Sequence, residues 1–127
     1  MNSESTLGID IYTAMRGEEN ARRLVELSRG TASDAVIADF TIDFVYGQVW
    51  ARDGLDQKQR SLVTISILIA LRQVGELENH LKIGLNNGLT LTEIEEAIIQ
   101  AAPYAGFPAA WSAAKILADH RKSLGVN

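Results

Sequence analysis

Apolar residues recur at helical spacing along most of this chain, and no stretch alternates apolar and polar residues between turn residues as a strand would. The sequence therefore predicts an all-α fold, a compact bundle of six to seven helices in one domain spanning residues 1–127. The expected helices cover about 18–29, 33–53, 57–72, 75–87, 91–104 and 108 onward, and an N-terminal arm or short helix lies within 1–16.

Capping residues, glycine and proline mark where these helices begin and end. Asp56 suits the N-cap of the helix after the Asp53-Gly54 break, and Thr90-Leu-Thr-Glu93 has the pattern of a capping box. Gly88 fits the position after a helix end, and Pro108 fits a first turn. Pro103 is expected to kink or end its helix near Tyr104.

The apolar patterns also predict which faces are buried. The helix over 57–72 is apolar on nearly every side, which indicates a central, buried helix. In the last helix Trp111, Ala114 and Leu117 are expected to face inward. Many small residues between 101 and 114 favour close helix packing, and the surplus of apolar helical surface indicates burial against another subunit.

Composition excludes several classes of function. The 127 residues include no cysteine, which rules out disulfides, thiolate metal sites and thiol catalysis. A net charge of −4 without a basic run argues against nucleic-acid binding. The apolar run over 62–71 is too short to cross a membrane. The polar, acidic start over 1–10 has no apolar signal core, so we expect a cytoplasmic protein.

His80 is the first candidate for chemistry. Glu76 precedes it by four residues, so both side chains project from one face of the predicted helix. A carboxylate beside an imidazole raises the histidine pKa and fixes its tautomer, which suits proton transfer near neutral pH. The alternative is a structural or solvated histidine. The pair has no third ligand at obvious spacing, so the sequence predicts no metal site. His120, in a charged C-terminal segment, is expected to be solvated.

Arg60 and Trp50 complete the set of candidates. Arg60 would be a carboxylate clamp, since its planar fork of donors matches a carboxylate; otherwise it is a solvated residue of the first turn or an ion-pair partner of Asp56. Trp50 lies one turn from Tyr46, and such a pair belongs more often to a core than to a site. The sequence contains no glycine-rich phosphate-binding loop.

The sequence resembles the carboxymuconolactone decarboxylase family in a set of blocks that run in the family's order from about residue 45 to 118. The blocks are Gly47-Gln-Val-Trp50, Gly54-Leu-Asp56 with Arg60-Ser-Leu62, Glu76-Leu-x-x-His80, Asn86-Asn-Gly-Leu-Thr90 with Glu93-Ile94, and Tyr104-Ala-Gly-x-Pro-Ala-Ala110. The resemblance implies the alkylhydroperoxidase D-like helical fold. A related branch reduces peroxides through Cys-x-x-Cys before the family histidine; Gln73 and Glu76 stand at those positions, which excludes peroxidase chemistry.

The resemblance further implies a cofactor-independent decarboxylase that converts γ-carboxymuconolactone to 3-oxoadipate enol-lactone in protocatechuate catabolism. On this reading His80 is the acid or oxyanion donor, Glu76 orients it, Arg60 clamps the substrate carboxylate, and Trp50 forms part of an apolar wall. The resemblance also implies a homo-oligomer, a ring of six built as a trimer of dimers. Two alternatives stay open: a cofactor-independent enzyme acting on another lactone or keto acid, and a non-enzymatic oligomeric binding protein.

Overall fold

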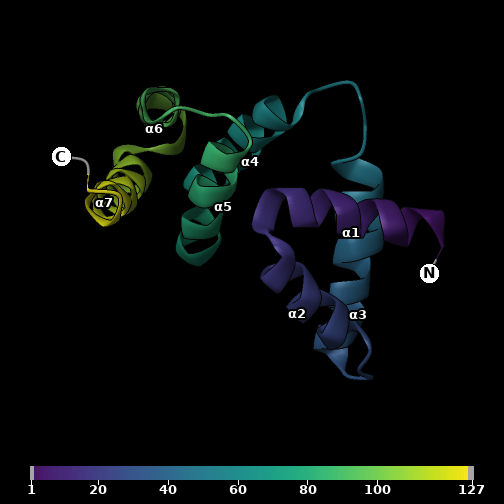
Figure 1. Cartoon of the computed structure of the whole chain (residues 1–127). Helices are drawn as coiled ribbons and strands as arrows, with labels where there is room; N and C mark the ends of the chain where they lie inside the picture. The colour runs from purple at the N-terminus through teal and green to yellow at the C-terminus, as the bar shows by residue number, and fades with distance from the viewer. Residues whose placement is uncertain (1, 126–127) are drawn as a thin grey trace. The chain divides into compact units, whose positions relative to one another are not determined.

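The computed structural model describes residues 2–125, and these residues form helices joined by short turns, with no strand among them (Figure 1). The elements are α1 Ser3–Arg16, α2 Glu18–Ser28, α3 Ser33–Phe40, the π-helix η1 Thr41–Val49, α4 Gln57–Leu71, α5 Val74–Asn86, α6 Leu91–Ala105 and α7 Phe107–Ser123. The predicted all-α class is confirmed.

The chain forms two compact units. The first, Met1–Leu55, contains α1, α2, α3 and η1, and the second, Asp56–Asn127, contains α4 to α7. The N-terminal segment, predicted to be an arm or a short helix, is the helix α1. That the whole chain makes one domain stays a prediction.

In the first unit, α1 packs across η1 (Figure 1), and the two helices meet at two glycines. Gly8 and Gly47 are buried, and a Cβ on either one would collide with the backbone of the facing helix. Side chains tie the same two helices: the Ser5 hydroxyl donates to the Asp43 carboxylate, and the Gln48 amide donates to Glu4 at 2.9 Å. Glycine is required here because only its lack of a side chain allows the two backbones to approach this closely.

The helix expected over 33–53 is α3 continued by η1, whose π character the sequence did not predict. The Trp50 N–H donates to the Val45 carbonyl, five residues back, at 2.9 Å. The apolar residues that fall at helical spacing lie on its exposed side: Ile37, Phe40, Phe44 and Val49. Its buried side carries Ala35, Ala38, Ile42, Tyr46 and Trp50.

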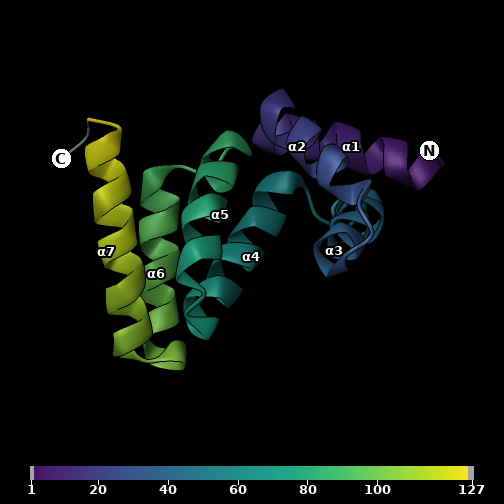
Figure 2. The ribbon, with the colours of Figure 1, turned by 90° about the horizontal axis from the view of Figure 1, so that it is seen from below.

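In the second unit, α4 and α5 form one hairpin and α6 and α7 form another, and the two hairpins pack together (Figure 2). Every helix contributes to one core. Its buried members are Ile65, Ile69, Leu77, Leu81, Leu89, Ile94, Ile98, Ala110, Ala113, Ile116 and Leu117.

The predicted caps of this unit are confirmed. The Asp56 carboxylate accepts from the Gln59 N–H at 2.7 Å, and the Gln59 side chain accepts from the Asp56 N–H at 3.0 Å. Thr90 and Glu93 exchange the same pair of bonds, both at 3.0 Å. Gly88 has φ 105°, the left-handed conformation that favours glycine just after a helix end.

The two prolines flank the turn between α6 and α7. Pro103 lies inside α6, which continues to Ala105, one residue beyond the expected break. Gly106, with φ 100°, makes the turn, and Pro108 occupies the first turn of α7 as expected.

The prediction that α4 is a central, buried helix holds for only one of its faces. Ile65 and Ile69 are fully buried, whereas Val63, Ile67 and Leu71 are at least half exposed. The reason is geometric: α5, α6 and α7 all pack on one side of α4 within its unit, so the opposite side stays open.

Trp111 was expected to point inward, and this is wrong, since 75% of it is exposed. A three-residue spacing drifts by about 60° per step around a helix of 3.6 residues per turn. Leu117, two such steps on, is buried, and Trp111 has therefore rotated well away from the buried face.

Within residues 2–125, no helix combines the length and the apolar character that a bilayer-spanning segment needs.

Replacing Ile65 by alanine should lower the free energy of unfolding by about 2–5 kcal/mol, because it removes a completely buried side chain and leaves a cavity. Ile67→Ala is the matched control, since Ile67 lies on the same helix with 52% of its surface exposed, and it should cost well below that range. Urea unfolding followed by circular dichroism measures both. Equal losses for the two variants would contradict the observed burial.

Glu93 should contribute to the loss of stability in acid. Its pKa lies below the ordinary value of 4.5 because its carboxylate accepts the backbone N–H of Thr90 and, secondarily, bonds Lys58. Its contribution is therefore complete above about pH 4.5 and disappears as the pH falls through the lowered pKa. Glu93→Gln keeps a capping-box residue but does not titrate, so its stability should fall less between about pH 5 and pH 3.

The matched control is Glu96→Gln, one turn along α6. Glu96 is exposed and makes no hydrogen bond or ion pair with any residue in 2–125. The pH dependence of its unfolding should follow the wild type. A Glu93→Gln variant with the same acid profile as the wild type would rule out this contribution.

Candidate functional site

Arg60 and His80 lie on helices that pack directly together. Arg60 stands in the first turns of α4 and His80 in the middle of α5, and both side chains are half-buried. On α5, His80 lies one turn before Gly84, and the same stripe continues to Asn87, the residue that follows the helix. Gly84 faces α4, because a Cβ on it would meet Ile65 and Ser61 of that helix.

The contact between α4 and α5 is close because Gly84 has no side chain. A Cβ on Gly84 would come within 2.9 Å of Ile65 Cδ1 and 3.0 Å of Leu89 Cδ1. Beside it, Asn87 Nδ2 donates to the hydroxyl of Ser61 at 2.9 Å, and Ser61 is completely buried. No sequence pattern predicted that these two residues pair, although Ser61 directly follows the candidate Arg60.

The alternative in which Arg60 pairs with Asp56 is not observed. The Asp56 carboxylate is the N-cap of α4 and accepts from Gln59, while Arg60 meets Asp56 only through a backbone bond of 3.0 Å. The Thr64 hydroxyl donates to the Arg60 carbonyl at 2.8 Å. The first turns of α4 are thus fixed through backbone and cap, and the carboxylate of Asp56 does not serve as the partner of the Arg60 guanidinium.

Glu76 lies one turn before His80 on α5, with its side chain exposed. It makes no hydrogen bond or ion pair with any residue between 2 and 125. The structure therefore places the two groups on one face of α5, as the spacing predicted, without a bond that joins them. Whether Glu76 orients His80 stays a prediction.

Trp50 belongs to the first unit, where it is buried. Its ring stacks on Tyr46, with centroids 6.0 Å apart, and Tyr12 meets Tyr46 edge-on at 4.9 Å. This aromatic cluster joins α1 to η1, which agrees with the alternative that Trp50 and Tyr46 are core residues. Its predicted role as an apolar wall stays a prediction.

His120, expected to be solvated, is half-buried beside a hollow of about 230 Å³ between α5 and α7. Lys82, Asp119 and Ser123 also line this hollow. His120 Nε2 is shielded from solvent and has no hydrogen-bond partner in the described part of the chain. The expectation is wrong because the last turns of α7 pack along α5 and do not project into solvent.

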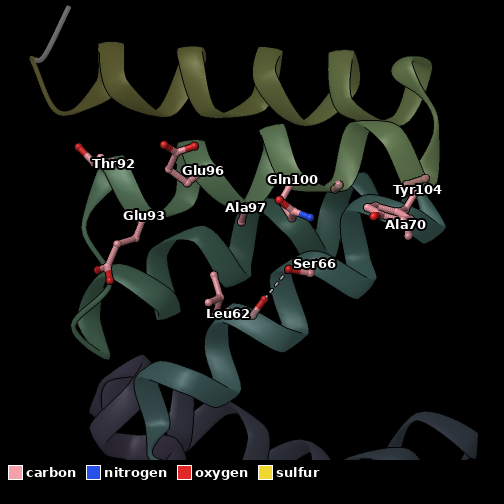
Figure 3. A pocket seen from close by; sticks show the side chains of 11 residues that line it. Leu62, Ser66, Ala70, Thr92, Glu93, Glu96, Ala97, Gln100 and Tyr104 are labelled. Carbon is pink, nitrogen blue, oxygen red and sulfur yellow. Dashed lines mark hydrogen bonds between the residues drawn. The ribbon is translucent and has the colours of Figure 1, made fainter.

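A larger hollow, about 740 Å³, lies between α4 and α6, and none of the predicted site residues lines it. Figure 3 shows Leu62 and Ser66 of α4 facing Ala97 of α6, with Glu93 near one end and Tyr104 at the other. The hollow exists because alanines recur every fourth residue along this side of α6. It is an open groove with small side chains at its base.

No three His, Asp or Glu residues in the described range 2–125 are grouped so that they could hold a metal ion. The chemistry available at the α4–α5 contact is that of one imidazole, one guanidinium and a nearby carboxylate, a set suited to anion binding and proton transfer.

Comparison with known proteins identifies close relatives. The profile of the carboxymuconolactone decarboxylase family matches residues 35–119. The 4-carboxymuconolactone decarboxylase of Acinetobacter baylyi is 37% identical over 128 aligned residues, which cover 99% of this chain and 94% of that protein. The nitrosuccinic acid decarboxylase of Metarhizium robertsii is 46% identical over 66 residues, 52% of this chain and 46% of that protein.

Proposed function

Because the chain belongs to the carboxymuconolactone decarboxylase family, we propose that it removes CO₂ from γ-carboxymuconolactone to give 3-oxoadipate enol-lactone without a cofactor. The chain is an enzyme of the carboxy-lyase class. The observation that carries the choice of substrate is the relative named 4-carboxymuconolactone decarboxylase, which this chain matches over nearly the full length of both proteins. A role in protocatechuate catabolism and a cytoplasmic location follow from this proposal.

The proposed reaction places three requirements on the site. The bond between the γ-carbon and its carboxylate breaks, and the electron pair moves through the ring double bond onto the lactone carbonyl oxygen. This cleavage releases CO₂, and the α-carbon then takes up a proton, which gives the enol-lactone. The site must hold the remaining acetate arm, stabilise the oxyanion and deliver the proton.

Three side chains of the α4–α5 hairpin suit these requirements. Arg60 holds the acetate carboxylate with its planar fork of donors. His80 donates to the developing oxyanion or protonates the α-carbon, and its half-buried position supports this role because a partly desolvated imidazole interacts more strongly with charge. Glu76, one turn away, favours the protonated imidazole through its charge.

A second candidate substrate class is favoured by the relative from Metarhizium. That protein is named for a different acid, nitrosuccinic acid, although it shares 46% identity over half of this chain. The alternative is therefore decarboxylation of another small carboxylic acid on the same scaffold. Turnover of γ-carboxymuconolactone and of nitrosuccinic acid by the purified protein, measured side by side, separates the two.

Substitution of the three proposed residues should affect different kinetic constants. His80→Ala should lower kcat by about 10²–10⁴-fold, or roughly 3–5 kcal/mol of barrier, with a smaller effect on KM. Arg60→Ala should mainly raise KM, because a carboxylate clamp acts in the ground state too. Glu76→Gln should have an intermediate effect and move the pH optimum downward, since a neutral amide no longer favours the protonated imidazole.

The measurement is a spectroscopic assay of lactone decarboxylation between about pH 5 and pH 9. His120→Ala is the matched control, because His120 is the other histidine of the chain and should leave kcat near the wild-type value. Near-normal turnover by a folded His80→Ala variant would refute the proposed role of His80.

The proposal includes self-association, with a hexamer built as a trimer of dimers as the expected form. It is supported by large apolar side chains that are exposed on the α6–α7 hairpin: Ile99 62%, Tyr104 85%, Phe107 67% and Trp111 75%. Ile99, Phe107 and Trp111 line a nearly apolar hollow of about 480 Å³. Exposed apolar clusters of this kind mark contact surfaces on soluble proteins.

Light scattering at micromolar concentration should therefore detect an oligomer, and Trp111→Ala combined with Phe107→Ala should shift the mass toward smaller species. Leu7→Ala, on exposed α1 surface, serves as the control for a general loss of apolar area. A wild-type protein that is monomeric in this measurement contradicts the proposal.

A further inference from the structure

Ser61, buried on α4, and Asn87, the half-buried residue that follows α5, form a polar link between these two helices. Asn87 Nδ2 donates to Ser61 Oγ at 2.9 Å, and Ser61 has no exposed surface. The link lies beside the close helix contact, since Ser61 Cβ lies 3.8 Å from the position a Cβ on Gly84 would take. A buried hydroxyl is costly to leave without its hydrogen-bond partner, so the link favours one register of the two helices.

The link lies next to both residues of the proposed site. Ser61 directly follows Arg60 on α4. Asn87 lies on the same stripe of α5 as His80, two helical turns further on, or roughly 10 Å at 1.5 Å per residue. A slide or rotation of α5 against α4 would therefore move His80 relative to Arg60.

A second link holds the start of α4 from another side. Lys58 forms an ion pair of 3.0 Å with Glu93, in the first turn of α6. This pair is partly exposed, so it contributes little by itself. The bond between Ser61 and Asn87 instead links α4 to the end of α5, and its Ser61 end is fully buried.

We propose that Asn87, through its hydrogen bond to Ser61, is a positioning residue that places His80 against α4 for proton transfer. The proposal rests on the function proposed above, and it adds a residue that does not itself touch the substrate. Its physical basis is that a displacement of about 1 Å between a catalytic group and its substrate can lower the rate by about 10²-fold.

The kinetic experiment compares Ser61→Ala, Asn87→Ala and the double variant Asn87→Ala/His80→Ala in the full chain. Each single variant should lower kcat by between 10-fold and about 10²-fold with a smaller change in KM. In the His80→Ala background, Asn87→Ala should produce no further loss, because the group that it positions is absent. Circular dichroism melting establishes that each variant is folded at the assay temperature.

Ser112→Ala is the matched control. Ser112 also accepts a side-chain hydrogen bond from α4, from Arg72 Nη2 at 3.0 Å, but at the opposite end of the helix. Like Ser61→Ala, this substitution removes a serine hydroxyl that accepts a hydrogen bond from a side chain at the end of another helix. It should leave kcat and KM at wild-type values.

A second measurement does not depend on the reaction. The chain has two histidines, so NMR resolves the imidazole signals of His80 and His120 separately. Asn87→Ala and Ser61→Ala should shift the His80 signals and leave those of His120 in place, and Ser112→Ala should leave the His80 signals unchanged.

The outcomes separate the two proposals. A wild-type protein that does not decarboxylate either acid overturns the proposed function, and the NMR shifts then decide the positioning role alone. Unchanged His80 signals in folded Asn87→Ala overturn the positioning role, as does an equal loss of kcat in the presence and absence of His80.

Discussion

The close approach of α4 and α5 at Gly84 is the contact on which the second unit depends. With no side chain at this point, Ile65 and Leu89 place their terminal methyl groups against the α5 backbone. The same approach brings Asn87 within bonding distance of Ser61. A larger residue at position 84 would widen the gap, and both the methyl contacts and the part-buried hydrogen bond would weaken together.

Stability and proposed chemistry occupy different faces of the same helices. Ile65 and Ile69 of α4 face the core, whereas Arg60 stands at a different angle around the helix, and on α5 the core residues Leu77 and Leu81 lie beside the stripe that carries His80. Residues of the proposed site can therefore be substituted without substitutions in the hydrophobic core. This separation is consistent with relatives of substantial identity that are named for different acids.

The sequence predicted what depends on local chemistry. The caps at Asp56 and Thr90 and the stop at Gly88 were found because each satisfies backbone groups within a few residues. Burial was harder to predict. Trp111 and Ile67 are apolar residues on helices, but whether their side of the helix is covered depends on where the neighbouring helices lie. The link between Ser61 and Asn87 joins positions 26 apart, which no local pattern reveals. Glu76 and His80 lie on the shared face that their spacing predicted, and the predicted orienting role of Glu76 stays a prediction.

Charge explains why a fixed arginine matters for the proposed substrate. The chain carries a net charge of −4, so its overall field does not attract an anion. At physiological salt, interactions between exposed charges are screened within about 8 Å, and recognition must then come from groups in contact with the carboxylate. A half-buried guanidinium is less screened than an exposed one and presents its donors in a fixed plane. The rigid start of α4, capped by Asp56 and held by Ser61, gives Arg60 the defined position that such contact recognition requires.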